Sequence, residues 1–325
     1  MKAIVWTKYG PPEVLQLEEL TKPQPKDNEL LVRIVATTVA AGDTEVRNLS
    51  LPFLYRFPLR LYTGLRRPTR IRVLGQELAG EIEAVGKEVS DYQVGDAVFG
   101  TSGFSFGSYA EYIALPEKDS LSKKPAAITF DEAAAMPLGG LEALHFLRQG
   151  NIQPGQSALI YGAGGSIGSF AIQLARHLGA EVTAVDKEEK WEMMRSLGAA
   201  HVLDYRRKDF GKGEERYDLI FDVVGKSSFS WSLRSLKPTG IFLLANAGIS
   251  DLLRGAFAGM ASGKKVIMGS ADHSPRDLAY MAGLMADGKI KAVIDRRYAL
   301  EEIAEAHHYV ESGQKQGNVV VTVGE

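Results

Sequence analysis

The residues best suited to bind a ligand form a glycine-rich turn that follows a short apolar run at residues 158–161. Glycines let a backbone approach a pyrophosphate closely, and the first turn of a helix supplies amide donors and the positive end of its dipole. A helical pattern follows at 167–178, and a second apolar run at 182–185 ends on Asp186. This order predicts a βαβ unit that binds a dinucleotide. The turn residues expected at the pyrophosphate are Gly162, Ala163, Gly164, Gly165, Ser166, Ile167 and Gly168.

The glycine spacing departs from a strict Gly-x-Gly-x-x-Gly pattern, because Ile167 stands where the third glycine would follow Gly162 and Gly164. Two registers stay open: one with glycines at 162, 165 and 168, and one with Ala163 in the first position. The acid lies 18 residues after Gly168 (186 − 168). That distance, with a strand before the turn and a helix after it, is the context in which the motif indicates dinucleotide binding.

The surrounding elements predict an α/β protein with two domains. Short β segments separated by glycines in residues 1–124 indicate a small irregular barrel. Residues 125–270 alternate six apolar strands with helices, which predicts a doubly wound parallel sheet. Residues 271–325 add two helices and a strand that is expected to return to the first domain. We therefore expect a discontinuous catalytic domain (1–124 and 271–325) with the nucleotide domain inserted.

Composition excludes several classes of protein. A net charge of −2 gives no overall attraction to nucleic acid or to anionic membranes. The absence of cysteine excludes disulfides and thiolate metal sites. Because no signal peptide or apolar run of 18 residues occurs, we expect no transmembrane segment and a cytoplasmic protein.

Residues 51–73 hold six arginines among aromatic and aliphatic residues. The leading interpretation is an insertion that folds over a substrate cleft as a lid. A second is a local contact with an anion or a membrane surface, since arginine heads can face phosphates while apolar neighbours are buried. Binding of single-stranded nucleic acid would suit the same pattern, but nothing else in the chain supports it.

Two segments carry a resemblance to a known family. Residues 75–100 read GQELAGEIEAVGKEVSDYQVGDAVFG and resemble the segment G-x-E-x-x-G-x-V-x-x-V-G…G-D-x-V of the medium-chain dehydrogenase/reductase superfamily. Residues 197–205 read LGAAHVLDY and are similar to the L-G-A-x-x-V-I-x-Y stretch of its quinone reductases. The resemblance covers nearly the whole chain and points to the zinc-free quinone oxidoreductase branch. It implies a GroES-like β-barrel catalytic domain beside a Rossmann domain.

The zinc ligands of the superfamily's alcohol dehydrogenases are missing. Those enzymes carry a Cys in a C-G-T-D-like stretch and a His in G-H-E, where this chain has residues 40–43 (AAGD) and Gln76. Alanine cannot ligate a metal, and a neutral amide is a poor ligand for Zn²⁺. We therefore expect no zinc and no other metal.

Without a Lewis acid, an electrophilic acceptor is easier to reduce than an alcohol is to activate. The expected function is NAD(P)H-dependent hydride transfer to a quinone or an activated alkene such as an enone. The acceptor's oxyanion needs donors, for which the candidates are Thr44, Tyr55 and Tyr62. Asp43 matches the acid that the family holds at the cleft, with a turn-capping role as its alternative. An alcohol/carbonyl oxidoreductase and a nucleotide-binding protein without turnover stay open.

At the nicotinamide end the resemblance implies contacts from two loops that follow parallel strands. Asn318, at the start of the last strand, is a further candidate for cofactor binding. The residues of the two loops at the nicotinamide end are Val224, Gly225, Asn246, Ala247 and Gly248.

The edge run 265–268 could pair across a two-fold axis, which predicts a homodimer.

The adenosine end carries conflicting signals. Asp186 would accept the ribose 2′-OH of NAD and repel a 2′-phosphate. Lys190 and Tyr205 match a pair that the quinone reductases use on the 2′-phosphate, and Lys187 and Arg206 lie close enough in sequence to neutralise the acid. NADPH is favoured slightly by the resemblance, and NADH stays open.

Overall fold

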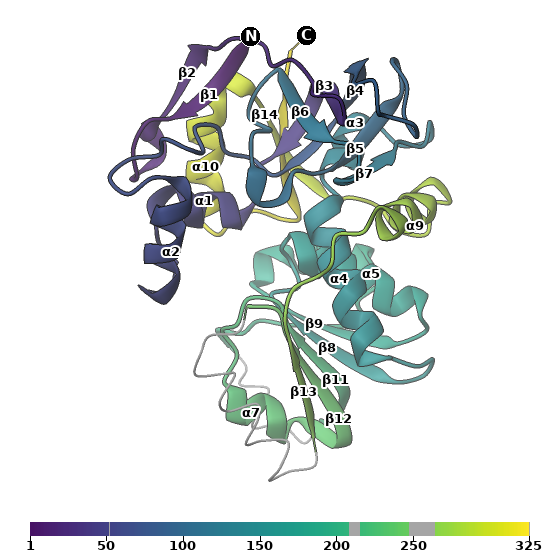
Figure 1. The fold of residues 1–325 in the computed structure, drawn as a ribbon. Coiled ribbons are helices and arrows are strands. Elements are labelled where there is room, and N and C mark those ends of the chain that lie inside the picture. The colour runs from purple at the N-terminus through teal and green to yellow at the C-terminus, as the bar shows by residue number, and fades with distance from the viewer. Residues whose placement is uncertain (52, 208–214, 247–263, 325) are drawn as a thin grey trace. The chain divides into compact units, whose positions relative to one another are not determined.

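The computed structural model describes residues 1–51, 53–207, 215–246 and 264–324 (Figure 1). The chain forms two compact units. One, called here the barrel unit, comprises Met1–Leu138, His273–Asp287 and Ala292–Glu325. The other, called here the sheet unit, comprises Gly139–Asp272 and Gly288–Lys291.

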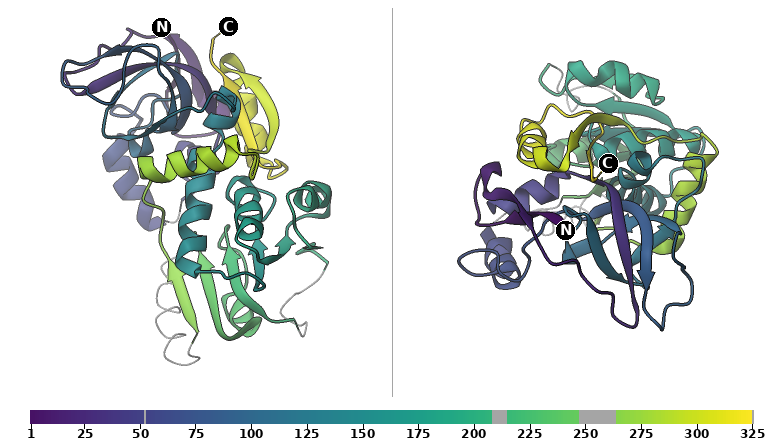
Figure 2. Two further views of the ribbon diagram at one scale, coloured as in Figure 1. Left: turned by 90° about the vertical axis from the view of Figure 1, so that its right-hand side faces the viewer. Right: turned by 90° about the horizontal axis from the view of Figure 1, so that it is seen from above.

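The barrel unit is built around the long strand β3, which pairs antiparallel with β4, β6 and β15. The main sheet has the order β14-β15-β3-β4-β5-β7, and β1 pairs with β2 in a separate ribbon. Because β15 pairs with β3, the C-terminal segment lies beside the N-terminal strands (Figure 2). The strands are β1 (Lys2–Trp6), β2 (Leu15–Glu19), β3 (Glu29–Thr38), β4 (Glu77–Val85), β5 (Ala97–Thr101), β6 (Tyr112–Pro116), β7 (Ser120–Lys123), β14 (Ile294–Ala299) and β15 (Asn318–Thr322).

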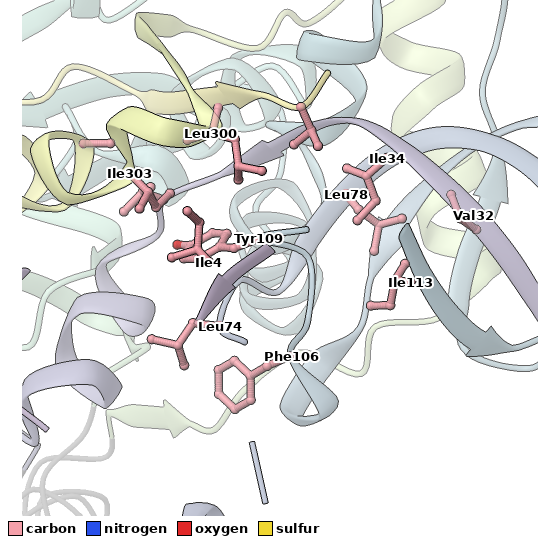
Figure 3. Close-up of a cluster of buried hydrophobic side chains, with 14 of the residues drawn as sticks. Ile4, Val32, Ile34, Leu74, Leu78, Phe106, Tyr109, Ile113, Leu300 and Ile303 are labelled. Carbon is pink, nitrogen blue, oxygen red and sulfur yellow. The ribbon is translucent and has the colours of Figure 1, made fainter. Parts of the chain in front are cut away.

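The core of the barrel unit joins segments that are far apart in sequence. Ile4, Ile34, Leu78, Tyr109 and Leu300 belong to one buried cluster, and Figure 3 shows Ile4 beside the ring of Tyr109. Burial of this apolar surface is the main favourable contribution to folding, and it fixes the C-terminal helix against the N-terminal strands.

The sheet unit holds six strands in the order β10-β9-β8-β11-β12-β13, and every pair is parallel. This confirms the doubly wound parallel sheet predicted from the sequence. The chain order reverses between β8 and β11, and open α/β sheets bind ligands at the carboxyl ends of strands at such a point. The strands are β8 (Ser157–Tyr161), β9 (Glu181–Val185), β10 (His201–Leu203), β11 (Tyr217–Asp222), β12 (Leu236–Leu244) and β13 (Lys265–Met268).

The helices include two that the sequence patterns did not indicate, α1 and α2, both between β3 and β4. Helix α3 ends at Ala134 and Pro137 begins α4, so a short break separates the two helices. Within the described ranges, no helix is both long and apolar enough to cross a membrane. The helices are η1 (Pro12–Val14), α1 (Ala41–Asn48), α2 (Phe53–Thr63), η2 (Gly103–Ser105), α3 (Phe130–Ala134), α4 (Pro137–Gly150), α5 (Ser166–His177), η3 (Glu188–Lys190), α6 (Trp191–Ser196), α7 (Phe229–Arg234), α9 (Pro275–Ala286), η4 (Leu300–Glu302) and α10 (Ile303–Glu311).

Candidate active site

The glycine turn leaves the carboxyl end of β8 and enters α5, at the reversal point of the sheet. Gly162 has φ +81°, a left-handed conformation that favours glycine. A Cβ on Gly168 would lie 2.4 Å from the Gly162 carbonyl oxygen and 2.5 Å from the Ala163 Cα. A Cβ on Gly165 would meet nothing closer than 3.7 Å. Gly162 is thus required for the turn and Gly168 for packing of the helix on the strand, whereas space does not require Gly165.

The first turn of α5 points amide donors at the place where a pyrophosphate would sit. Gly165 is the N-cap, and Ser166, Ile167 and Gly168 are the first three helical residues. The N–H groups of these positions have no acceptor within the helix itself. The helix has 12 residues, so its positive dipole end adds to this preference for an anion.

Asp186 closes the turn. Its Oδ2 accepts a hydrogen bond from the Gly164 N–H at 2.9 Å, and its Oδ1 accepts one from the Lys187 N–H at 2.8 Å. The Lys190 Nζ lies 3.5 Å from Oδ1, and both side chains are buried. A Cβ on Gly164 would lie 2.3 Å from the Lys190 Cδ, so the aliphatic part of the lysine side chain packs directly against this glycine. The structure thus brings Asp186, Lys187 and Lys190 together with the turn, and the acid is balanced by a cation.

Tyr205 and Arg206 follow β10 at the same edge of the sheet. The exposed ring of Tyr205 lies 6.0 Å from that of Tyr161, measured between centroids. The Arg206 guanidinium binds Asp204 at 2.6 Å and Glu189 at 2.9 Å. These hydrogen bonds hold the pKa of the Asp204 carboxyl well below its usual range. Arg206 therefore forms its ion pairs with Asp204 and Glu189, and its influence on Asp186 or on a 2′-phosphate stays a prediction.

The candidate nicotinamide loops are organised by Asp222, which sequence reasoning missed. Its Oδ1 accepts hydrogen bonds from the N–H groups of Val224 at 3.0 Å and Gly225 at 2.8 Å. The Asn246 Nδ2 donates to the Val223 carbonyl at 2.8 Å, which joins the loop after β12 to the loop after β11. The available signal was an acid at the end of an apolar strand, as at Asp186. The other two predicted contacts, Ala247 and Gly248, lie outside the described residues.

Asn318 lies in the barrel unit. Its buried side-chain amide donates a hydrogen bond to the Val293 carbonyl at 3.1 Å, and so does its backbone N–H at 2.8 Å. These bonds attach the start of β15 to the segment before β14. The structure gives this residue a supporting role, and its contact with a cofactor stays a prediction.

Asp43 is the third helical residue of α1 and is buried. Its Oδ2 accepts hydrogen bonds from the Ala40 N–H at 3.0 Å and from the Tyr109 hydroxyl at 3.1 Å. Burial raises the pKa of this carboxyl to about 7. The alternative role given to Asp43, capping a turn, is therefore present in the structure. In the next position Thr44 donates its hydroxyl to the Ala41 carbonyl at 2.8 Å.

A second buried acid, Glu77, was quoted in a motif but not assigned a role. It accepts hydrogen bonds from the Leu138 N–H at 2.8 Å and from the Thr38 hydroxyl. Burial raises the pKa of this carboxyl as well. The neighbouring Gln76 donates its side-chain amide to the Gly103 carbonyl at 3.0 Å.

Tyr55 and Tyr62 are seven positions apart on α2, so they lie on one side of that helix. Both rings are exposed. The Tyr62 hydroxyl donates to the Phe104 carbonyl at 3.0 Å. The structure therefore places the two predicted tyrosine donors on a different helix from Asp43 and Thr44.

Comparisons with known proteins agree with this arrangement. Residues 26–126 match the family described as "Alcohol dehydrogenase GroES-like domain", which confirms the predicted GroES-like fold, and residues 197–321 match "Zinc-binding dehydrogenase". A quinone oxidoreductase of Pseudomonas aeruginosa is 32% identical over 338 residues, covering 98% of this chain and 99% of the relative. The 2-methylene-furan-3-one reductase of Solanum lycopersicum is 30% identical over 333 residues, covering 99% and 79%. The solved structure of Escherichia coli quinone oxidoreductase complexed with NADPH has 27% identity and a TM-score of 0.84, covering 99% and 100%.

Proposed function

The chain belongs to the quinone oxidoreductase-like branch of the medium-chain dehydrogenase/reductase superfamily, and we propose that it uses NADPH to reduce a quinone or an activated alkene without zinc. It is an oxidoreductase that works with a nicotinamide nucleotide. The observation that carries this conclusion is the 30–32% sequence identity, over 98–99% of this chain, to a quinone oxidoreductase and to 2-methylene-furan-3-one reductase. The choice of NADPH and the independence of zinc go beyond that identity.

Residues of the sheet unit would hold the cofactor. The first turn of α5 would receive the pyrophosphate, because its amides and dipole favour an anion, while Gly162 permits the turn and Gly168 permits close packing of the helix on the strand. The loops at Val224, Gly225 and Asn246 would line the nicotinamide end, since they follow β11 and β12 at the carboxyl edge of the sheet. The bound nucleotide supplies the hydride, and the chain orients it.

Two contacts favour NADPH over NADH. A free carboxylate at the end of β9 would repel a 2′-phosphate, but Asp186 accepts two backbone N–H groups and faces the Lys190 ammonium at 3.5 Å. The negative charge of Asp186 is thus already balanced by Lys190, so the acid would repel a 2′-phosphate less than a free carboxylate. The same lysine would also face that phosphate. The exposed ring of Tyr205 stands at the same edge.

The residues of the barrel unit do not fit a zinc ion. Ala40 has no ligand atom, and the neutral amide of Gln76 is a poor ligand for Zn²⁺. Both oxygens of Glu77 accept hydrogen bonds, from the Leu138 N–H and the Thr38 hydroxyl, and the Asp43 Oδ2 accepts two, so the Asp43 Oδ1 is left as a single buried oxygen without a hydrogen-bond partner. Among the residues that the structure describes, no three His, Cys, Asp or Glu side chains form a group that could hold a metal. Stoichiometric zinc in the purified protein, measured by elemental analysis, would contradict zinc independence.

For the acceptor end we propose that Tyr55 supplies a hydroxyl donor to the developing oxyanion, and that Tyr62 supplies a second one once its hydroxyl leaves the Phe104 carbonyl. Preorganised donors stabilise a charge that appears only as the reaction proceeds. Asp43 and Thr44 would support the site indirectly, since their hydrogen bonds hold the first turn of α1 in place.

We further propose a functional division of the chain, with residues 1–124 and 271–325 catalytic and residues 125–270 nucleotide-binding.

We also propose a cytoplasmic homodimer. Within the described residues β13 is the last strand of its sheet, so its outer edge is available to pair with the same strand of a second copy. A monomer at all concentrations in light scattering would overturn the dimer.

Steady-state turnover tests the proposed function. The purified protein is mixed with NADPH or NADH and then with a para-quinone, an ortho-quinone, an enone or a simple ketone, while nicotinamide absorbance is followed. We expect oxidation of the nucleotide with quinones or enones and a larger kcat/KM for NADPH. Turnover restricted to the ketone would favour the alcohol/carbonyl alternative. Tight nucleotide binding with no turnover on any acceptor would favour a non-catalytic role.

A further inference from the structure

Helix α2 exposes the face that such a helix normally buries. Leu54, Phe57 and Leu61 share one side of the helix, by their spacing of three and four residues. Their exposed fractions are 59%, 64% and 46%, while Leu59 and Thr63 on another side make the contact with the rest of the barrel unit. An amphipathic helix of a globular protein turns its apolar stripe to the core. The stripe of α2 points away from it, and in Figure 1 the helix projects beyond α1.

Exposed apolar residues are concentrated around this helix. Of the 13 large hydrophobic residues that are exposed in the described part of the chain, six lie in α2 or just after it. Phe104, at 78% the most exposed of all, accepts the hydrogen bond of Tyr62 through its carbonyl. Clustered apolar surface of this kind marks an interaction site, whereas single exposed residues do not.

The charge of the segment is as unusual as its apolar face. Residues 51–73 carry six arginines and no acid, although the whole chain has a net charge of −2. Arg56 and Arg60 are four residues apart and line a pocket of about 570 Å³ together with Phe57. Five of the six arginines show no ion pair to an acid among the described residues, and Arg72 pairs at 3.4 Å with Glu18. This surface is therefore complementary to an anionic partner that also accepts apolar side chains.

The helix is held firmly at its C-terminal end. The Tyr9 hydroxyl shares a hydrogen bond of 2.6 Å with the Thr63 hydroxyl, and the Arg70 guanidinium donates to the Leu61 carbonyl at 2.8 Å. The N–H groups of Thr69 and Arg70 both donate to the Thr63 carbonyl. The exposed stripe is thus presented in a fixed orientation, which lowers the entropic cost of binding.

We propose that α2 and the arginine-rich segment that follows it dock the protein peripherally on the surface of an anionic phospholipid bilayer. Phe57 and Leu61 would enter the boundary between headgroups and acyl chains, while Arg56 and Arg60 would face the lipid phosphates. The two leucines of the stripe, Leu54 and Leu61, favour a bilayer over nucleic acid, because leucine offers no ring on which a base could stack. This docking is separate from the proposed reductase activity.

Vesicle sedimentation tests the proposal on the full-length protein. Vesicles of phosphatidylcholine alone are compared with vesicles that contain about one third phosphatidylglycerol, at low and high NaCl. We expect binding only to the anionic vesicles and a marked loss at high salt, because salt screens the arginines. Arg56→Gln/Arg60→Gln should lower the partition coefficient about 25-fold, or about fivefold for each arginine. Phe57→Ser/Leu61→Ser should lower it about tenfold or more, since both side chains lose their insertion.

Matched variants control for charge and for folding. Lys118→Gln/Arg276→Gln removes two exposed cations of the barrel unit outside the segment and should leave vesicle binding unchanged. Since the chain has no cysteine, Phe57→Cys accepts a single environment-sensitive fluorophore, with Val94→Cys, also exposed, as its control. The label at 57 should shift to the blue with anionic vesicles, and the label at 94 should not.

Three results would overturn the proposal. The first is no binding to the anionic vesicles at low salt. The second is binding that the α2 variants leave unchanged. The third is tighter binding of a single-stranded oligonucleotide through the same arginines. If the α2 variants bind vesicles as the wild type does but have a raised KM for the acceptor, the result would favour a lid over the substrate cleft instead. Turnover is measured separately, so failure of the docking does not affect the proposed reaction.

Discussion

The Tyr109 hydroxyl donates a hydrogen bond to the Asp43 Oδ2 over 3.1 Å, and neither side chain reaches solvent. The Tyr109 ring also meets the His307 ring edge-on, with centroids 5.6 Å apart. Burial lowers the pKa of His307 to about 3, so this histidine is neutral at neutral pH and offers Asp43 no compensating charge. Burial therefore raises the pKa of Asp43, although the Ala40 N–H and the Tyr109 hydroxyl, which stabilise the carboxylate, oppose this shift.

Replacement of Asp43 by Asn should flatten the dependence of stability on pH. In the unfolded chain this carboxyl ionises near its ordinary pKa of 3.8, and in the folded protein near 7. Between these values the folded state binds more protons than the unfolded state, so stability falls as pH rises from about 4 to about 7 and levels off above. Asp43→Asn keeps the acceptor oxygen and removes the titration. Urea unfolding at pH 5, 6, 7 and 8 measures the difference between the two proteins.

The expected result is a wild-type stability that declines across this range relative to the variant. Parallel curves for the two proteins would show that Asp43 ionises normally in the folded state. Tyr109→Phe serves as the companion variant, because it removes the hydroxyl that stabilises the carboxylate and should raise the pKa of Asp43 further.

Two glycines of the turn should respond differently to the same substitution. Gly168→Ala places a methyl group 2.4 Å from a backbone oxygen, and overpacking against backbone costs about 1–3 kcal/mol. Gly165→Ala has 3.7 Å of space and a φ of −91°, which suits any residue. Thermal unfolding should therefore show a lower Tm for Gly168→Ala and an unchanged Tm for Gly165→Ala. Equal losses in the two variants would contradict the packing role assigned to Gly168.

Lys190→Gln should weaken the use of NADPH more than that of NADH. The substitution removes the cation that balances Asp186 and would face the 2′-phosphate, and loss of one charged hydrogen bond costs about 1.5–3 kcal/mol. The kcat/KM for NADPH should fall about tenfold to hundredfold, with a much smaller change for NADH. Arg195→Gln removes an exposed cation of α6 and is the control. A similar loss with both nucleotides would place Lys190 outside the 2′-phosphate site.

Periodic apolar patterns were sufficient to predict the sheet unit. The six strands and the glycine turn follow from apolar runs bounded by glycines, because a parallel strand is buried on both faces. Asp186 was predictable as a residue at the end of a strand. Its second role, closing the turn through the Gly164 N–H, depends on where the backbone brings position 164, which spacing along the chain does not reveal.

The barrel unit was harder to predict from sequence. Helix α2 contains Pro58, a residue that disfavours a helix interior, and it exposes the apolar stripe that such spacing normally places against the core. The buried cluster of Asp43, Tyr109 and His307 joins residues up to 264 positions apart (307 − 43), and long-range contacts such as the pairing of β15 with β3 bring the C-terminal segment to that core.

The pairing of Arg47 with Glu311 should be worth more than an ordinary surface ion pair. The Arg47 side chain is 1% exposed, and its guanidinium binds Glu311 and, at 3.1 Å, the Gly10 carbonyl. Glu311 is the last residue of α10, where the helix dipole disfavours an acid, so its position is explained by the arginine. Glu311→Ala leaves a buried cation without its counter-charge. Such a loss costs about 3–5 kcal/mol when both partners are buried, and we expect about 2–3 kcal/mol here because Glu311 is 27% exposed.

A double-mutant cycle separates the pair from the burial of its charge. Glu311→Gln retains an acceptor oxygen and should cost less than Glu311→Ala. Arg47→Met replaces the cation by an apolar side chain of similar length, so Arg47→Met/Glu311→Ala should recover part of the stability lost in Glu311→Ala alone. The free energy of unfolding in urea is measured for the wild type, for each single variant and for the double variant. If the double variant is as unstable as the sum of the two single variants, the two side chains are not coupled, and Glu311 stabilises α10 through its 2.8 Å hydrogen bond with Asn48 instead.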